Sequence, residues 1–188
     1  MLARWSLNAR AAALVLAVTA LLFGSAAAAS ATSPATLGCA LGACHAEFVI
    51  QPDGRARIIE VNHRAIGDKC DLMLAEILQI PYFELVLRAH LGEQLDVAPT
   101  LNRARRGRNE AILADRAGTL TSAPGPYDRD ADGVRLSYRP ARTIGEHHEL
   151  YRTNRDYLGV VWAAGLDQDT ADRAVADFIA GNRWEITS

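Results

Sequence analysis

Apolar and polar positions predict a β-hairpin in the first half of the chain. Ala46–Ile50 has the pattern of a short strand, and Ala56–Asn62 supplies a second run with three branched apolar residues. Between them, Gln51-Pro52-Asp53-Gly54 combines the residue types that favour a tight turn. We therefore expect two antiparallel strands joined by this turn.

The middle of the chain contains further apolar segments of helical or strand length. Two helices are expected at Asp71–Leu78 and Tyr82–His90, because Ile80-Pro81 interrupts the pattern and Gly92 can end it. The other expected segments are a basic loop at Arg103–Arg108 and strands at Val134–Tyr138 and Tyr157–Ala163. This mixture predicts an α/β (α+β) fold with an antiparallel sheet and flanking helices.

The last helix has the clearest periodicity. Apolar residues recur at i, i+3, i+4, i+7 and i+8, at Ala171, Ala174, Val175, Phe178 and Ile179. Asp167 or Asp169 is expected to cap its N-terminus, and Gly181 is expected to end it. We therefore predict an amphipathic helix between these boundaries.

Residues 1–33 differ in composition from the rest of the chain. Arg4 and Arg10 precede an uncharged run from Ala11 to Ala31, and Ala27-Ala28-Ala29 offers a small-residue cleavage site. This pattern is typical of a secretory signal peptide. The run is also long enough to span a bilayer as an uncleaved apolar helix, which takes about 20 residues. We expect a signal-like or membrane-anchor segment at 1–33 and a folded part at 40–186.

The composition limits the function of the folded part. Hydrophobic residues make up 49% of the 188 residues, enough for a sizeable core, and the formal net charge is −2. Charges that nearly balance do not favour nucleic acid as a partner. The basic segment Arg103–Arg108 also contains no aromatic residue on which a base could stack. We therefore predict no nucleic-acid binding.

The three cysteines predict inert thiols. Cys39, Cys44 and Cys70 are too few and too irregularly spaced for a disulfide framework. Cys39, Cys44 and His45 resemble half of a zinc site, but no second pair of ligands completes a tetrahedron.

Four polar residues of the expected hairpin are candidates for a metal site. Glu60, Asn62 and Arg64 are spaced to share one face, and the hairpin can bring Glu47 beside them from the partner strand. Two carboxylates and an amide oxygen suit Mg²⁺ that carries nucleotide phosphates. Arg64 would place a permanent cation beside the transferring phosphoryl group. The alternative is an ordinary amphipathic hairpin whose solvent face is polar.

Two further polar motifs are weaker candidates. Asp128–Gly133 has the D-x-D-x-D-G start of a calcium loop, but the twelfth position is Arg139 instead of glutamate, so we expect a solvated acidic turn. Glu146–Glu149 contains adjacent histidines, which would face opposite sides of a strand. We expect a surface loop there.

The hairpin and the segments after it resemble the C-terminal part of the ATP-grasp enzymes. The resemblance rests on an acidic strand residue, Glu47, followed by the E-x-N-x-R motif of Glu60, Asn62 and Arg64. It continues through Ile66-Gly67, the helices that end at Leu91-Gly92, Arg116–Thr119 and the final helix, from about Ala40 to Ile186. Asn154–Val161 and Arg183-Trp184 are most similar to the ATP-grasp ligases of siderophore biosynthesis.

This resemblance implies a partial ATP-grasp fold, with Glu47, Glu60 and Asn62 as magnesium ligands and Arg64 as the catalytic cation. Enzymes of this family use Mg²⁺ and ATP to phosphorylate a carboxylate, and an amine then displaces the phosphate. The implied partners are small-molecule carboxylate and amine substrates, joined as an amide or ester. The family's phosphate-binding lysines precede this part of the fold, whereas Lys69 is the only lysine here and follows it. We expect negligible ligase activity from the chain alone, because the nucleotide-binding half is missing.

The two parts of the sequence imply different compartments, because ATP is scarce outside the cytoplasm. A cytoplasmic ligase fragment is expected if residues 1–35 arise from a wrong start or reading frame. The alternative is a non-enzymatic binding module that is exported, periplasmic or membrane-anchored, and that contacts a membrane only through residues 11–31. We favour the first hypothesis.

Overall fold

The computed structural model describes residues 14–22, 42–51, 53–93, 95 and 105–188, which fall into two compact units. Unit 1 contains Asp68–Gln79 and the described part of Thr100–Ser188. Unit 2 contains the described parts of Arg4–Gly67 and Ile80–Pro99, and it therefore carries all four candidate site residues.

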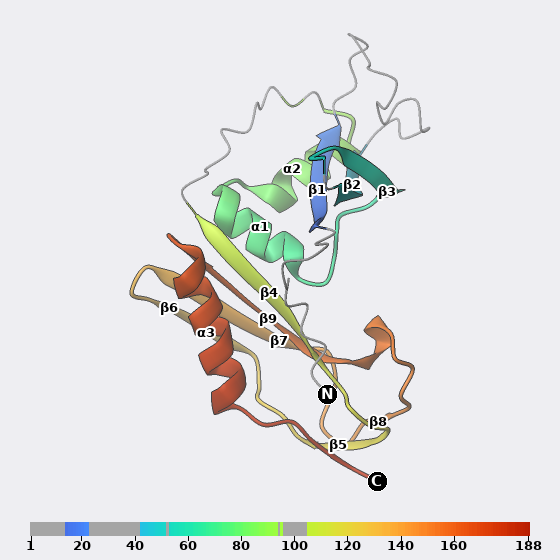
Figure 1. The fold of residues 1–188 in the computed structure, drawn as a ribbon, viewed down its shortest axis with the longest axis vertical. Coiled ribbons are helices and arrows are strands. Elements are labelled where there is room, and N and C mark those ends of the chain that lie inside the picture. The colour runs from blue at the N-terminus through green and yellow to red at the C-terminus, as the bar shows by residue number, and fades with distance from the viewer. Residues whose placement is uncertain (1–13, 23–41, 52, 94, 96–104) are drawn as a thin grey trace. The chain divides into compact units, whose positions relative to one another are not determined.

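Unit 2 is built on an antiparallel sheet with the strand order β1-β2-β3 (Figure 1). Its elements are β1 (Leu14–Leu22), β2 (Gly42–Ile50), β3 (Ala56–Asn62) and helix α2 (Tyr82–His90). Backbone hydrogen bonds close the β2–β3 turn: Gln51 N–H donates to Arg55 O at 2.8 Å, and Gly54 N–H donates to Gln51 O at 2.9 Å. Helix α2 packs against β2 and β1 and buries Tyr82, Leu85 and Ala89. The predicted hairpin and this helix are confirmed.

The apolar helix expected near the N-terminus is a strand in its described part. Leu14–Leu22 forms β1, which pairs with β2 from Leu14 opposite Ile50 to Leu22 opposite Gly42. The helix prediction was wrong here because periodicity alone does not distinguish a continuous apolar strand from an apolar helix. The rest of the Ala11–Ala31 run, including the expected cleavage site, lies outside the described residues. Among the described helices, none is both long and apolar enough to cross a membrane.

Unit 1 is centred on an antiparallel sheet with the strand order β4-β9-β7-β6. Its strands are β4 (Arg106–Leu113), β9 (Tyr157–Gly165), β7 (Val134–Pro140) and β6 (Tyr127–Ala131). Helix α3 (Gln168–Gly181) packs along this sheet (Figure 1), and α1 (Cys70–Leu78) contacts β4 and β9. Strand β9 is buried at every position after Tyr157. Its nearly unbroken apolar sequence therefore reflects an interior strand.

The last helix begins and ends as its sequence predicts. Asp167 is the N-cap, with Oδ1 accepting the Thr170 N–H at 2.8 Å, and the helix ends at Gly181. Its apolar face contributes Ala171, Val175 and Phe178 to the core, against residues of β7 and β9. The strands predicted at Val134–Tyr138 and Tyr157–Ala163 are confirmed as parts of β7 and β9.

A second, smaller sheet in unit 1 was not expected from the sequence. Its strands lie in the order β10-β5-β8, with bounds Glu185–Thr187, Gly118–Ser122 and His147–His148. A short 3-10 helix, η2 (Asn154–Asp156), follows β8 in the chain. Each of these strands is short and pairs with a distant segment, so no local periodicity marks it.

Three polar segments differ from their predictions. Arg106–Arg108 belongs to β4 instead of a loop, and residues 103–104 lie outside the described part of the chain. Asp128–Asp130 lies on β6, and the turn is confined to Asp132-Gly133. His148 is 5% exposed instead of lying on the surface. Arg106–Arg108 and His148 pair with strands that are distant in the chain, and Asp128–Asp130 pairs with the next strand, β7. In each case, strand pairing outweighs the local polarity.

Candidate metal site

The pairing of β2 with β3 places two carboxylates side by side. Glu47 on β2 is the cross-strand partner of Glu60 on β3. The register then shifts, because Phe48 faces Ile58 and leaves Ile59 as the extra residue of a bulge. Bulges redirect neighbouring side chains and are frequent beside functional sites. The structure thus brings Glu47 and Glu60 together at an irregular point of the sheet.

Asn62 joins this pair from the same strand as Glu60. Its Nδ2 donates to Glu60 Oε1 and lies 3.2 Å from His45 Nε2. The amide therefore presents its nitrogen to the carboxylate, and coordination of a metal through Oδ1 requires the amide to turn about its Cβ–Cγ bond.

His45 is a component of this cluster that the sequence analysis missed. It is 2% exposed, and its Nε2 lies 3.6 Å from Glu47 Oε1 as well as beside the Asn62 amide. Its Nδ1 lies 3.4 Å from the Arg64 carbonyl oxygen. With Nδ1 donating to that carbonyl, Nε2 has a lone pair for the Asn62 amide. The available signal was the i, i+2 spacing, which puts His45 and Glu47 on one face of β2.

Arg64 is placed differently from the carboxylates. Its guanidinium Nη1 donates to the carbonyl oxygens of Ala65 at 3.1 Å and Ile66 at 3.0 Å. The structure therefore gathers Glu47, Glu60 and Asn62 and leaves the positive charge of Arg64 on the adjoining loop.

The oxygen atoms of Glu47, Glu60 and Asn62 are suitable ligands for a hard divalent cation. Like charges directly opposite each other destabilise a sheet. Within the described residues, neither Glu47 nor Glu60 forms an ion pair with an arginine or lysine. No group of three or more His, Cys, Asp and Glu side chains in that part of the chain has the arrangement of a metal site, so the third donor would be the Asn62 amide. Carboxylate and amide oxygens are the ligands that Mg²⁺ accepts.

The cysteines take no part in this cluster. Cys44 is buried on β2, and Cys39 lies outside the described residues. Burial, with smaller contributions from Asp68 and Asp71, raises the pKa of Cys70 to about 11. Cys70 therefore stays a protonated thiol at neutral pH, in agreement with the prediction of an inert thiol.

Solved structures share this arrangement of strands and helices. An L-amino acid ligase from Bacillus licheniformis matches 82% of the chain at a TM-score of 0.63 and 18% sequence identity. A phosphoribosylglycinamide synthetase from Anaerococcus prevotii matches 78% at a TM-score of 0.63 and 13% identity. The chain has a partial ATP-grasp fold. A biotin carboxylase domain from Hydrogenobacter thermophilus, solved with MgADP and bicarbonate, matches 78% at a TM-score of 0.60 and 15% identity.

This partial ATP-grasp fold confirms the fold class expected from the sequence. The chain spans 38%, 37% and 32% of the ligase, the synthetase and the carboxylase domain, respectively. No protein-family pattern matches the chain, and no curated protein sequence matches it. Identities of this size establish the fold, and the chemistry has to be argued from the residues of this chain.

Proposed function

We propose that this chain carries the magnesium-binding part of an ATP-dependent ligase that forms an amide or ester through an acyl phosphate. The direct pairing of Glu47 with Glu60, with Asn62 on the same side of β3, is the observation that carries the proposal. Two facing carboxylates are suited to a divalent cation. The fold shared with ligases and with a MgADP-bound carboxylase domain supports Mg²⁺ and ATP as cofactors.

Each residue of the cluster has a role in this proposal. Glu47, Glu60 and the Asn62 amide oxygen hold Mg²⁺, which when bound offsets negative charge on the nucleotide phosphates. Before metal binds, His45 holds the Asn62 amide through Nε2, and Glu47 lies 3.6 Å from the same nitrogen. Arg64 supplies the cation that stabilises the transferring phosphoryl group, which requires its guanidinium to leave the Ala65 and Ile66 carbonyls.

The substrates in this proposal are a small carboxylate and a small amine. The sequence resemblance of Asn154–Val161 to ligases of siderophore biosynthesis supports that substrate class. We further propose negligible ligase activity for the 188-residue chain alone, because no lysine precedes Glu47 to hold the phosphates. Metal binding and catalysis would then be separable properties.

Titration with Mn²⁺, followed by electron paramagnetic resonance, tests the metal site in the full chain. We expect one saturable site from which Mg²⁺ displaces Mn²⁺. Glu47→Gln and Glu60→Gln should each weaken binding by about tenfold or more, because each removes a charged ligand. Glu185→Gln, on an exposed position of β10, is the matched control and should bind as the wild type does.

Two results would contradict this proposal. A chain that binds no Mn²⁺ saturably, or that loses binding equally in the Glu185→Gln control, has no metal site at the hairpin. ADP release that depends on carboxylate and amine, catalysed by the chain alone, would refute the proposed lack of activity and leave the metal site standing.

A further inference from the structure

A polar pocket of about 310 Å³ lies in unit 1, in the segment that connects β7 to β9. Its lining is mainly basic and aromatic: Arg142, His147, His148, Glu149, Tyr151 and Arg155. Ligand pockets in proteins range from about 300 to 1,000 Å³, so this one is of a size for a small metabolite.

Asp156 anchors the backbone that forms the pocket. It is 2% exposed, and its Oδ1 accepts the Tyr151 N–H at 2.9 Å while its Oδ2 accepts the Thr153 N–H at 3.1 Å. Burial opposes ionisation of Asp156, but hydrogen bonds from the backbone of Tyr151, Thr153 and Arg152 outweigh burial and hold its pKa below the usual value. The loop is thus wrapped around an ionised, buried carboxylate.

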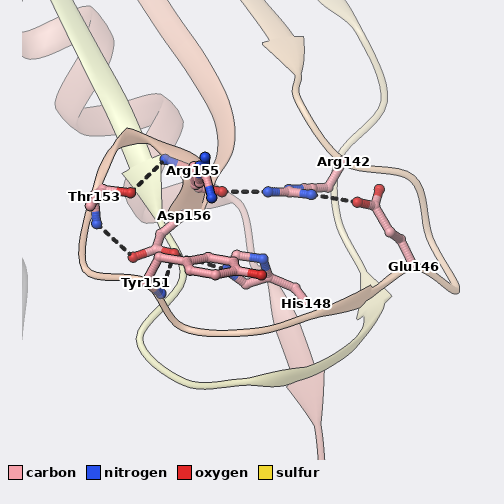
Figure 2. Close-up of polar contacts among 7 residues, drawn as sticks. All are labelled: Arg142, Glu146, His148, Tyr151, Thr153, Arg155 and Asp156. Atoms are coloured by element: carbon pink, nitrogen blue, oxygen red, sulfur yellow. Dashed lines mark hydrogen bonds and ion pairs between the residues drawn. The ribbon is translucent and has the colours of Figure 1, made fainter.

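Arg142 connects the two ends of the pocket-forming loop by hydrogen bonds. One of its terminal nitrogens donates to the Glu146 carboxylate and the other donates to the Arg155 carbonyl oxygen (Figure 2). Glu146 also accepts the Thr143 N–H at 3.1 Å. The pocket wall is therefore fixed before any ligand arrives, and the charge of Arg142 is balanced by Glu146.

Two histidine–carboxylate contacts also lie in this segment. His147 Nε2 lies 3.3 Å from Glu149 Oε1, and His148 Nε2 lies 3.2 Å from Asp156 Oδ1. The His148 contact has the distance of an ion pair, and among the described residues the buried His148 Nε2 has no hydrogen-bond partner.

Arg155 differs from Arg142, whose guanidinium pairs with Glu146. Its guanidinium carbon lies 5.5 Å from the centroid of the Tyr151 ring. Within the described part of the chain, no carboxylate forms an ion pair with it. Stacking on the ring orders the guanidinium and leaves its hydrogen-bond donors for a ligand. The pocket thus presents a guanidinium that no described carboxylate pairs with, beside an aromatic face.

We propose that this pocket binds the carboxylate of a small organic acid, with Arg155 as the residue that recognises it. A guanidinium matches a carboxylate with two parallel hydrogen bonds. This guanidinium suits a monoanion better than a phosphate dianion, because Glu149 also lines the pocket and would repel the second negative charge. The half-exposed Tyr151 ring adds an apolar surface for the carbon skeleton of the acid. The site uses residues of unit 1 only and does not depend on the proposed ligase function.

Calorimetric titration of the full chain with sodium benzoate, at constant ionic strength, tests this site. We expect saturable binding that is tighter than that of inorganic phosphate. Arg155→Gln should weaken benzoate binding by about tenfold or more, because it removes a charge-assisted pair. Arg152→Gln is the matched control: it removes a charge from the same loop but not from the pocket lining, and should change affinity by less than about twofold.

A second variant distinguishes the loss of a ligand contact from a folding defect. Tyr151→Leu keeps Arg155 and removes the aromatic face, so it should weaken benzoate more than acetate. Thermal unfolding without ligand checks that each variant is folded. Absence of saturable benzoate binding by the wild type, tighter binding of phosphate, or equal losses in Arg155→Gln and Arg152→Gln would each overturn the proposal.

Discussion

Replacing Glu60 with glutamine is expected to change the stability of the β2–β3 hairpin in opposite directions with and without Mg²⁺. Glu60 faces Glu47 across the sheet, and the Glu47 side chain is 36% exposed, so water screens the pair. Cross-strand side chains are about 5 Å apart, and two unit charges at that distance repel by about 0.8 kcal/mol in water. Without metal, Glu60→Gln should therefore stabilise the hairpin by about 0.5–1 kcal/mol.

Bound Mg²⁺ should reverse this sign. A ligand at one hundred times its dissociation constant stabilises the state that binds it by about 2.7 kcal/mol. The wild type gains this stabilisation, while the Glu60→Gln variant has lost a charged ligand and gains much less. At high Mg²⁺ the variant should therefore be less stable than the wild type by about 1–2 kcal/mol.

Hydrogen exchange of peptides from β2 and β3, in chelator and in Mg²⁺, measures this reversal. Tryptophan fluorescence is unsuitable, because two of the three tryptophans, Trp162 and Trp184, belong to unit 1 and would contribute to the signal. Glu185→Gln on β10 should leave exchange of β2 and β3 unchanged in both buffers. A Glu60→Gln variant that is less stable than the wild type in chelator would refute the repulsion on which the metal site is argued.

Two predictions concern unit 1. Gly159→Ala should lower the free energy of unfolding of unit 1 by about 2–3 kcal/mol, because the added Cβ would overlap the fully buried Tyr138 ring. Gly125→Ala is the control: its Cβ meets open space, so it should change that free energy by less than about 0.5 kcal/mol. Urea unfolding followed by tryptophan fluorescence measures both, and equal changes would refute the packing argument. Asp156 has a lowered pKa, so the stability it adds is present above its unfolded pKa of about 3.9 and is lost as the pH falls below that value. Asp156→Asn should lower stability at pH 7 and reduce the loss on acidification from pH 5 to 3, and an unchanged acid dependence would contradict this account.

The elements predicted correctly are those whose signal is local. The hairpin was found because its turn residues and both strands lie within one short segment, and the last helix because its apolar face repeats with helical period. Strand β10 was missed because Glu185 pairs with Ser122, far away in the chain. The same cause hid the burial of His148, which depends on Asp156 and on pairing with Gly118.

The candidate metal site was also predictable only in part. The spacing of Glu47 and Glu60 across a short turn was enough to infer that they lie side by side. The bulge at Ile59 was not predictable, because it depends on how the strands pair beyond the turn. The direction of the Arg64 side chain was not predictable either. Its guanidinium donates to the loop carbonyl oxygens of Ala65 and Ile66 instead of lying in the cluster.

Strand β1 has a consequence for how this protein can be handled. Strand β2 is hydrogen-bonded to β1 on one side and to β3 on the other. A chain shortened to begin after Leu22, or one cleaved at Ala27–Ala29, would turn β2 into an edge strand of nine residues. The remaining β2–β3 sheet would have two strands, and an isolated two-stranded sheet is marginally stable at best in water. The apolar N-terminal segment should therefore be kept when the protein is produced, because without β1 the sheet of unit 2 is reduced to the β2–β3 pair.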